Sequence, residues 1–252
     1  MDNIKYVLTI IPLLLIQTIV RGQSFEEYKI LADSGNAEAQ YRLGLCYLVG
    51  NGVEKDSTEA FNLFLKSANQ GHAKAQYRVG HCFGFAQGVK VNDSLAVVWL
   101  EKAAKQNIDS AQYDLGRYYK NGWFVKKNDS LSFYWFSTAA AQGHGESIYW
   151  VGACYQDGTW VEQNDSLAIV WYKKAADLKV ANAQYQLGRA YVSGEGVEQD
   201  YEKAVYWFSL AAEQGYYFAK IQLGVCYENG YGVPKDREKA EYWYNYNPAK
   251  KE

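Results

Sequence analysis

Glycine-rich stretches are the first candidates for chemistry in this 252-residue chain. Residues 43–53, LGLCYLVGNGV, combine a G-x-G with a cysteine and a tyrosine, a composition that would suit a phosphate-binding loop. The stretch lacks the third glycine of a dinucleotide fingerprint and the Gly-Lys-Ser/Thr of a P-loop, and we predict no strand before it. These glycines therefore do not indicate a phosphate site.

Cysteine and histidine residues are the next candidates. Cys46, Cys82, Cys154 and Cys226 are separated by multiples of 36 residues. We predict that they are buried free thiols that pack as small apolar residues, the alternative being a redox or metal site. The chain has no H-E-x-x-H motif, no His/Cys ligand cluster, no Ser-x-x-Lys and no Lys-Thr-Gly. We therefore expect no catalytic residue, no metal and no cofactor.

Net charge and the N-terminus limit the class of protein further. A formal net charge of −2 provides no basic field for nucleic acid. Lys5 precedes an apolar run over residues 6–20, which is shorter than a bilayer span. Val20, the last residue of the run, and Gly22 are small enough for the −3 and −1 positions of a signal peptidase site. We predict a signal peptide over residues 1–22, with an uncleaved anchor as the alternative. Cleavage would leave a secreted or periplasmic protein without a stable membrane span.

The glycine-rich stretch belongs to an internal repeat. Its counterparts start at intervals of 36 residues and occupy 79–89, 115–125, 151–161, 187–197 and 223–233. In each copy the apolar spacing predicts a first helix that ends at glycines such as Gly50 and a second helix of similar length. The second helices are expected to begin at Asp or Asn N-caps. These caps are Asp56, Asn92, Asn128, Asn164, Asp200 and Asp236.

Two further sets of residues recur in phase with the repeat. One glycine lies inside each first helix, where it costs roughly 1 kcal/mol against alanine, so we expect a neighbouring helix to approach closely there. The set begins at Gly44 and ends at Gly224. One tryptophan recurs in the second helices of repeats two to six, where we predict a large core side chain. These are Trp99, Trp135, Trp171, Trp207 and Trp243.

Repeat five, AQYQLGRAYVSGEGVEQDYEKAVYWFSLAAEQG at residues 183–215, resembles the SEL-one-like repeat family of the tetratricopeptide-repeat superfamily. The resemblance implies an all-α fold, a right-handed αα-superhelix of six helix–turn–helix repeats, that serves as a protein-interaction scaffold. It also raises a less favoured alternative, because cysteine-rich relatives are reported as penicillin-binding proteins or weak β-lactamases. The expected segments are a signal peptide 1–22, a capping half-repeat 23–36, and repeats 37–72, 73–108, 109–144, 145–180, 181–216 and 217–252, the last with a C-terminal cap.

A candidate partner surface follows from comparing the copies with one another. One stripe of the first helices varies most between repeats, and its charged or titratable candidates are Arg78, His81, Asp114, Arg117 and Arg189. Aromatic residues in repeats three and four replace polar or glycine positions of the other copies. They are Trp123, Phe124, Trp150 and Trp160. We expect these residues to bind a partner, the alternatives being a solvated face and packing between loops.

Three copies carry the sequence Asn-Asp-Ser-Leu at the start of the second helix. The asparagine is predicted to be an N-cap, but the tripeptide is also an N-glycosylation sequon. Asp-Ser-Leu further resembles a bacterial O-glycosylation motif, which would modify Ser94, Ser130 and Ser166. An O-linked glycan is compatible with the asparagine cap, whereas an N-linked glycan on that asparagine hardly is.

Two functions fit the sequence. The first is an exported, non-catalytic repeat scaffold that binds an unknown protein or peptide. The second is a cell-envelope glycan or peptidoglycan binder, in which Trp123, Trp150 and Trp160 stack on sugar rings.

Overall fold

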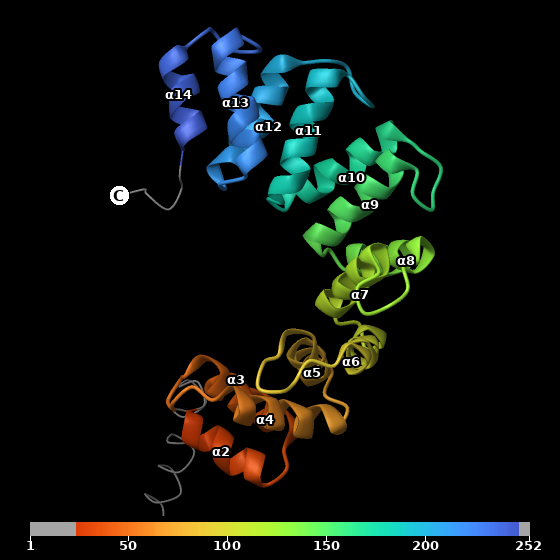
Figure 1. Ribbon diagram of the computed structural model, residues 1–252, viewed down its shortest axis with the longest axis vertical. Helices are drawn as coiled ribbons and strands as arrows, with labels where there is room; N and C mark the ends of the chain where they lie inside the picture. Colours follow the sequence, from red (N-terminus) through yellow and green to blue (C-terminus); the bar gives the residue numbers. More distant parts are fainter. Residues whose placement is uncertain (1–23, 247–252) are drawn as a thin grey trace, which may run out of the picture. The chain divides into compact units, whose positions relative to one another are not determined.

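The computed structural model describes residues 24–246, and this part of the chain is all-α (Figure 1). It contains thirteen helices, and no strand occurs between residues 24 and 246. The expected signal peptide (1–22) and the tail after residue 246 lie outside the described residues. None of the thirteen helices combines the length and hydropathy that crossing a membrane requires.

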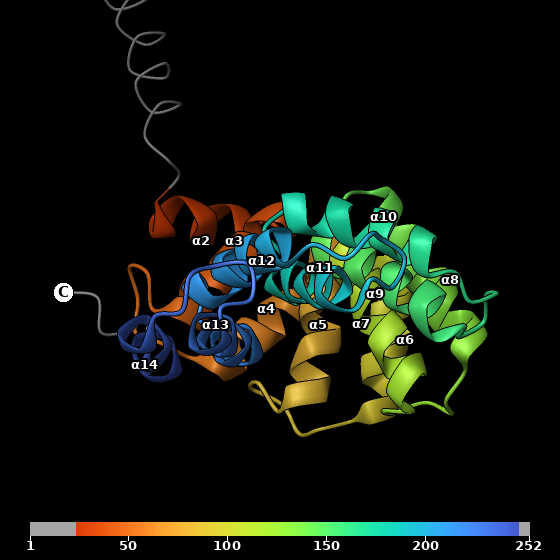
Figure 2. The ribbon, with the colours of Figure 1, turned by 90° about the horizontal axis from the view of Figure 1, so that it is seen from above.

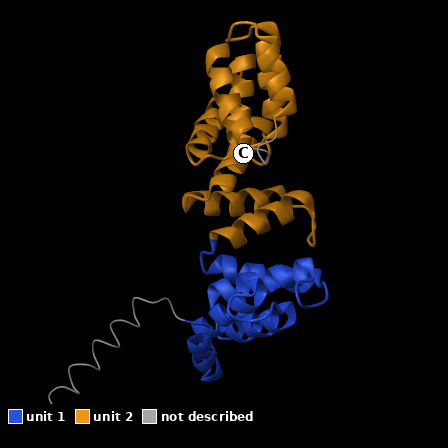
Figure 3. Cartoon of the chain, turned by 90° about the vertical axis from the view of Figure 1, so that its left-hand side faces the viewer, with its two compact units in different colours: residues 1–108 blue, residues 109–252 orange. Residues whose placement is uncertain are grey.

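The chain divides into two compact units, residues 1–108 and 109–252 (Figure 3). The helices of the first unit are α2 (Phe25–Asp33), α3 (Ala37–Val49), α4 (Ser57–Asn69), α5 (Ala73–Phe85) and α6 (Asp93–Lys105). The helices of the second unit are α7 (Asp109–Asn121), α8 (Asp129–Ala141), α9 (Gly145–Asp157), α10 (Asp165–Asp177), α11 (Ala181–Ser193), α12 (Tyr201–Glu213), α13 (Tyr217–Asn229) and α14 (Arg237–Asn245).

Each repeat is a pair of helices that lie side by side and are joined by a short loop (Figures 1 and 2). The predicted N-caps of the second helices are confirmed. The side-chain oxygen of each cap accepts a hydrogen bond of 2.8–3.0 Å from a backbone N–H in the first turn. Such caps satisfy donors that the helix itself cannot, which fixes where each second helix starts.

The glycines inside the first helices are sites of close helix packing, as expected. A Cβ atom added to any of the six would lie within 3.0 Å of one large side chain on the second helix of the same repeat. These side chains are Phe64, Leu100, Phe136, Tyr172, Phe208 and Tyr244. The first five of them are at most 1% exposed. A large side chain packed into a glycine notch is thus the central contact of each helix pair.

The recurring tryptophans differ from the prediction. Trp99 and Trp135 are buried, but Trp171, Trp207 and Trp243 are only half-buried. The side chain that enters the glycine notch is the residue directly after the tryptophan. The tryptophan therefore lies beside the core contact, and in the last three repeats it keeps part of its ring at the surface.

Candidate interaction surface

One position in the loop between paired helices has an unusual backbone conformation in repeats three and four. The other four repeats have glycine there, with φ between 68° and 74°, at Gly52, Gly88, Gly196 and Gly232. In repeats three and four the position is held by Phe124 (φ 63°) and Trp160 (φ 67°). A left-handed conformation costs a residue other than glycine roughly 1–2 kcal/mol. The fold therefore holds two aromatic side chains in a conformation that opposes stability.

Packing explains why glycine is the usual residue. A Cβ on Gly196 would collide with the backbone carbonyl of Asp165, and a Cβ on Gly232 with that of Tyr201. Each of these carbonyls belongs to the start of the second helix in the preceding repeat. At the equivalent position of repeat four, Trp160 has a Cβ and a ring that is largely at the surface.

The rings of these loops are open to solvent. Trp160 is 63% exposed, Trp123 46% and Phe124 37%. Phe124 contacts Tyr118 edge-to-face, with ring centroids 5.0 Å apart, so part of this ring is packed. Trp160 makes no ring contact with any other residue among those described. We call Trp123, Phe124 and Trp160 the loop aromatic surface.

Arg117 adds a cation beside this surface. Its guanidinium carbon lies 5.3 Å from the ring centroid of Trp123 and 5.6 Å from that of Tyr113, within cation–π range of both. The Asp114 carboxylate lies 3.9 Å from the Arg117 guanidinium. Arg117 and Asp114, both predicted from the variable stripe of α7, are thus brought together with Trp123.

Trp150 differs from the other three aromatic candidates. It is half-buried on α9, and its ring stacks on Phe136 with centroids 5.6 Å apart and an interplanar angle of 12°. The Lys120 ammonium covers it at 4.8 Å from the ring centroid. Trp150 therefore contributes to the packing of α8 against α9, a contact that the sequence pattern did not reveal.

The remaining stripe candidates belong to other helices. Arg189 is exposed on α11 and donates a 3.1 Å hydrogen bond to Gln186. Arg78 and His81 are half-buried on α5, in the first unit. The imidazole of His81 lies 4.5 Å from the exposed Phe85 ring, and burial, assisted by the charge of Arg78, lowers its pKa. None of these three residues is among the contacts of Trp123 described above.

The four cysteines are buried free thiols, as predicted. Burial raises the pKa of the Cys82, Cys154 and Cys226 thiols to about 11 and also raises that of Cys46. A thiol with so high a pKa is a poor nucleophile at neutral pH. Within residues 24–246, no three His, Cys, Asp or Glu side chains are grouped as a metal site requires.

The candidate modification sites lie in the first turns of three second helices. Ser94 and Ser166 are exposed and Ser130 is half-buried. The preceding Asn128 and Asn164 use their side-chain oxygens as helix caps, accepting from the backbone N–H groups of residues 131 and 167. A modification on the serine hydroxyl would leave these caps intact.

Comparison with known proteins identifies the repeat. The Sel1 repeat model matches residues 37–72, 73–108, 109–144, 145–180, 181–216 and 218–246. The chain belongs to the Sel1 repeat family. Membership of this family agrees with the helix pairs, the glycine notches and the Asp or Asn N-caps described above. Sel1 repeats are αα-repeat scaffolds that generally mediate protein interactions.

Solved Sel1 repeat structures are similar to this chain. A Sel1 repeat protein from Oxalobacter formigenes shares 30% identity and a TM-score of 0.82, covering 92% of this chain and 94% of that one. The protective antigen c5321 of uropathogenic Escherichia coli shares 32% identity and a TM-score of 0.65 over 88% of this chain, which spans 56% of the antigen. The Pseudomonas aeruginosa immunity protein Pa5087, at 21% identity and a TM-score of 0.52, shares the fold over 82% of this chain and 79% of that one. A search of curated proteins found no match.

Proposed function

We propose that this Sel1 repeat protein is an exported, non-catalytic scaffold that binds a protein or peptide through the loop aromatic surface and Arg117. The observation that carries the proposal is the left-handed backbone at Phe124 and Trp160, where the other repeats have glycine. Strain of this kind is held in place by the surrounding structure and is concentrated at binding and active sites. Packing of the side chain does not account for the strain at Trp160, because its ring is 63% exposed.

The chemistry of the surface suits recognition of a protein. Tryptophan and arginine are enriched among the residues that contribute most to binding energy at protein interfaces. Trp123 and Arg117 already contact each other, so a partner would meet a preorganised ring and cation. A preorganised surface loses less conformational entropy on binding than a mobile one does.

A pull-down with residues 23–252 as bait tests the proposal, using envelope and secreted fractions of the source organism as prey. The test variant carries Trp123→Gln, Phe124→Gly and Trp160→Gly, because glycine is the native residue at the last two positions in four other repeats. The matched control is Tyr242→Ala, which removes an aromatic ring of similar exposure (56%) from α14. We expect a specific protein to be retained by the wild type and the control and lost by the test variant.

Two outcomes would contradict this proposal. Equal capture by all three baits would mean that binding occurs elsewhere on the repeats. Capture by none would favour the second candidate, an envelope glycan or peptidoglycan binder, which is supported by the exposed indoles of Trp123 and Trp160 because such rings stack on sugar rings. Retention on immobilised peptidoglycan, with release by soluble sugars, would then distinguish the glycan binder.

Export and modification are parts of the proposal that one mass measurement tests. Protein purified from its native source should begin at Gln23 and lack residues 1–22. If Ser94, Ser130 and Ser166 carry O-linked glycans, the intact mass should exceed the sequence mass and fall by one glycan with Ser166→Ala. A mass equal to that of the unmodified chain from Met1 would contradict both export with cleavage and glycosylation.

A further inference from the structure

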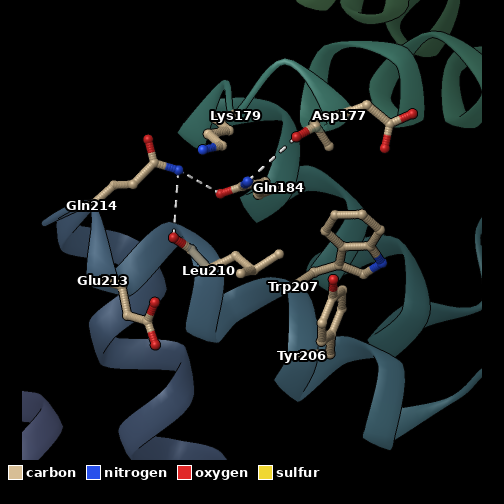
Figure 4. Close-up of a pocket in the computed structure, with 9 residues that line it drawn as sticks. Asp177, Lys179, Gln184, Tyr206, Trp207, Leu210, Glu213 and Gln214 are labelled. Atoms are coloured by element: carbon tan, nitrogen blue, oxygen red, sulfur yellow. Dashed lines mark hydrogen bonds between the residues drawn. The ribbon is translucent and has the colours of Figure 1, made fainter.

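An open pocket lies on the second unit, between the C-terminal end of α10, the start of α11 and α12 (Figure 4). Its volume is about 590 Å³. Tyr206, Trp207 and Leu210 contribute its apolar wall, and Figure 4 shows the two aromatic rings next to each other. None of the loop aromatic residues lines it, so the pocket is distinct from the surface proposed above.

The equivalent tryptophans of two other repeats each contact a lysine ammonium. Three residues after Trp99, Lys102 places its ammonium 3.9 Å from the indole centroid. Three residues after Trp171, Lys174 does the same at 4.6 Å. The fold thus presents this indole face to an ammonium twice, through a lysine one helical turn further along. A cation over a tryptophan face is the most favourable of the aromatic cation contacts.

Repeat five has the tryptophan without the lysine. Leu210 stands where Lys102 and Lys174 stand in the other two repeats. No lysine or arginine of the described chain covers Trp207, and its side chain lines the open pocket. The neighbouring Tyr206 is 57% exposed and meets Trp207 edge-to-face at 5.0 Å, which extends the aromatic wall outward.

Charged residues around the pocket favour a cation. Asp177 and Glu213 contribute two negative charges and Lys179 one positive charge, which gives a net charge of −1. None of the three forms an ion pair or a side-chain hydrogen bond within the described residues. Figure 4 shows Lys179 and Glu213 on the side of Gln214 and Asp177 on the side of Trp207, so the charge on the aromatic side of the pocket is the Asp177 carboxylate.

The polar floor of the pocket is already satisfied. Gln214 donates a 2.7 Å hydrogen bond to Gln184, and the Gln184 amide donates to the backbone carbonyl of Ala176. The free groups of the pocket are therefore the two carboxylates, the Lys179 ammonium and the aromatic faces. Carboxylates and aromatic faces together suit a cation, and Leu210 adds an apolar surface along which an alkyl stem can pack.

From this juxtaposition we propose that the pocket binds a lysine side chain presented by a partner protein. The alkyl stem packs along Leu210, the ammonium lies over the Trp207 and Tyr206 rings, and the Asp177 carboxylate balances its charge. The partner's lysine thereby takes the place that Lys102 and Lys174 occupy within their own repeats. The site is independent of the loop aromatic surface, so neither proposal depends on the other.

Nuclear magnetic resonance titration of the full chain with short peptides tests the proposal. The probes are acetyl-Ala-Ala-Xaa-Ala-Ala-amide with lysine, norleucine or glutamate at the central position. We expect the lysine peptide to shift the Trp207 indole N–H resonance with a dissociation constant of about 1 mM. It should bind about tenfold more tightly than the norleucine peptide, a difference of about 1.4 kcal/mol, within the range of desolvated cation–π contacts. The glutamate peptide should not bind.

Leu210→Lys is the decisive variant. It places a lysine at the position that Lys102 and Lys174 hold in two other repeats, so its own ammonium should fill the site and compete with the peptide. It should weaken the lysine peptide at least about tenfold. Leu210→Met is the matched control, since it introduces an unbranched side chain, as lysine does, without the charge, and it should bind as the wild type does. Asp177→Asn should weaken the lysine peptide and leave the norleucine peptide unchanged.

Three results would overturn the proposal. They are equal affinity for lysine and norleucine, undiminished lysine binding by Leu210→Lys, and the absence of any shift at about 20 mM lysine peptide, a concentration that would saturate a millimolar site. Circular dichroism of Leu210→Lys verifies that a loss of binding does not come from unfolding. Failure of this experiment would leave the loop aromatic surface and its pull-down test unaffected.

Discussion

The side-chain amide of Gln142 donates a 2.7 Å hydrogen bond to the buried side-chain oxygen of Gln112, joining the end of α8 to α7. The same pair, with the same distance, recurs in repeats one, two and five, as Gln70–Gln40, Gln106–Gln76 and Gln214–Gln184. Repeat four has apolar residues at both positions, Ile148 and Leu178. The two positions change together because a buried amide oxygen without its donor is costly.

A mutant cycle at Ile148 and Leu178 measures this dependence. Ile148 is 6% exposed, so Ile148→Gln buries an amide oxygen that has no donor, and we expect the free energy of unfolding to fall by about 1–3 kcal/mol. Adding Leu178→Gln should restore about 0.5–1.5 kcal/mol by supplying the donor. Urea denaturation of the two single variants and the double variant closes the cycle. Strictly additive effects would show that the amides do not pair in repeat four.

At the glycine notch between α11 and α12, we expect alanine to be less stable than glycine, the opposite of the usual helix preference. Alanine is favoured over glycine inside a helix by about 1 kcal/mol, but a Cβ at Gly188 would lie within 3.0 Å of the fully buried Phe208 ring. Gly188→Ala should therefore destabilise the fold by about 1–3 kcal/mol, the usual cost of overpacking. Thermal unfolding followed by circular dichroism checks this. A melting temperature equal to or above that of the wild type would mean that the helices separate easily.

Backbone strain at Trp160 is separable from the loss of its ring. Trp160→Gly and Trp160→Ala both remove the indole, but only alanine keeps a Cβ at φ 67°. We expect the glycine variant to be more stable than the alanine variant by about 1 kcal/mol, measured by urea denaturation. The same comparison at Lys179 (φ 62°), which lies outside the loop aromatic surface, is the control and should have the same sign. A more stable alanine variant would refute the assignment of strain.

Buried thiols predict low reactivity in the folded protein. At pH 8 a thiol with a pKa of about 11 has roughly a hundredfold less thiolate than one at the ordinary value of 9.0, because the two differ by two pH units. We expect Cys82, Cys154 and Cys226 to be labelled by iodoacetamide only after unfolding in urea. Mass spectrometry of tryptic peptides identifies each site. Rapid labelling of any of the three in the native protein would contradict its burial.

The same thiols make stability depend on alkaline pH. Below about pH 9 they are protonated in both states, so their contribution is fully present. Between about pH 9 and 11 the unfolded chain loses protons that the folded chain retains, so the free energy of unfolding falls as pH rises. A variant with alanine at all three positions should show a shallower fall over this range. An unchanged slope would assign the alkaline loss to other groups.

Local chemistry made much of the fold predictable. The Asx caps and the helix-ending glycines specify their conformation through their own side chains, or lack of them, so the helix pairs followed from the sequence. The sequence did not predict which residue enters each glycine notch. Trp207 and Phe208 are adjacent and both apolar, and helical periodicity does not decide which of two neighbours points into the notch.

The candidate surface was predictable in part. The replacement of glycine by Phe124 and Trp160 is visible in the sequence, but their exposure and strain are not, because both depend on how the loop meets its neighbours. Trp150 looked equally suitable, and only its stacking on Phe136 shows that it is packed. The sequence does show that Leu210 replaces a lysine found at the same position of two other repeats. Only the structure shows that those lysines lie over tryptophan rings, which is what makes the replacement informative.

The loop position occupied by Trp160 also bears on how such a protein diversifies. Tryptophan and one of the glycine codons differ by a single base, so an exposed indole can be gained or lost at this loop in one mutational step. The step passes between two states that the scaffold accommodates, since glycine holds the same position in four sister repeats. In a protein built from duplicated repeats, an equivalent loop position is present in every repeat. Substitutions at these positions can therefore create a new binding surface while the fold stays the same.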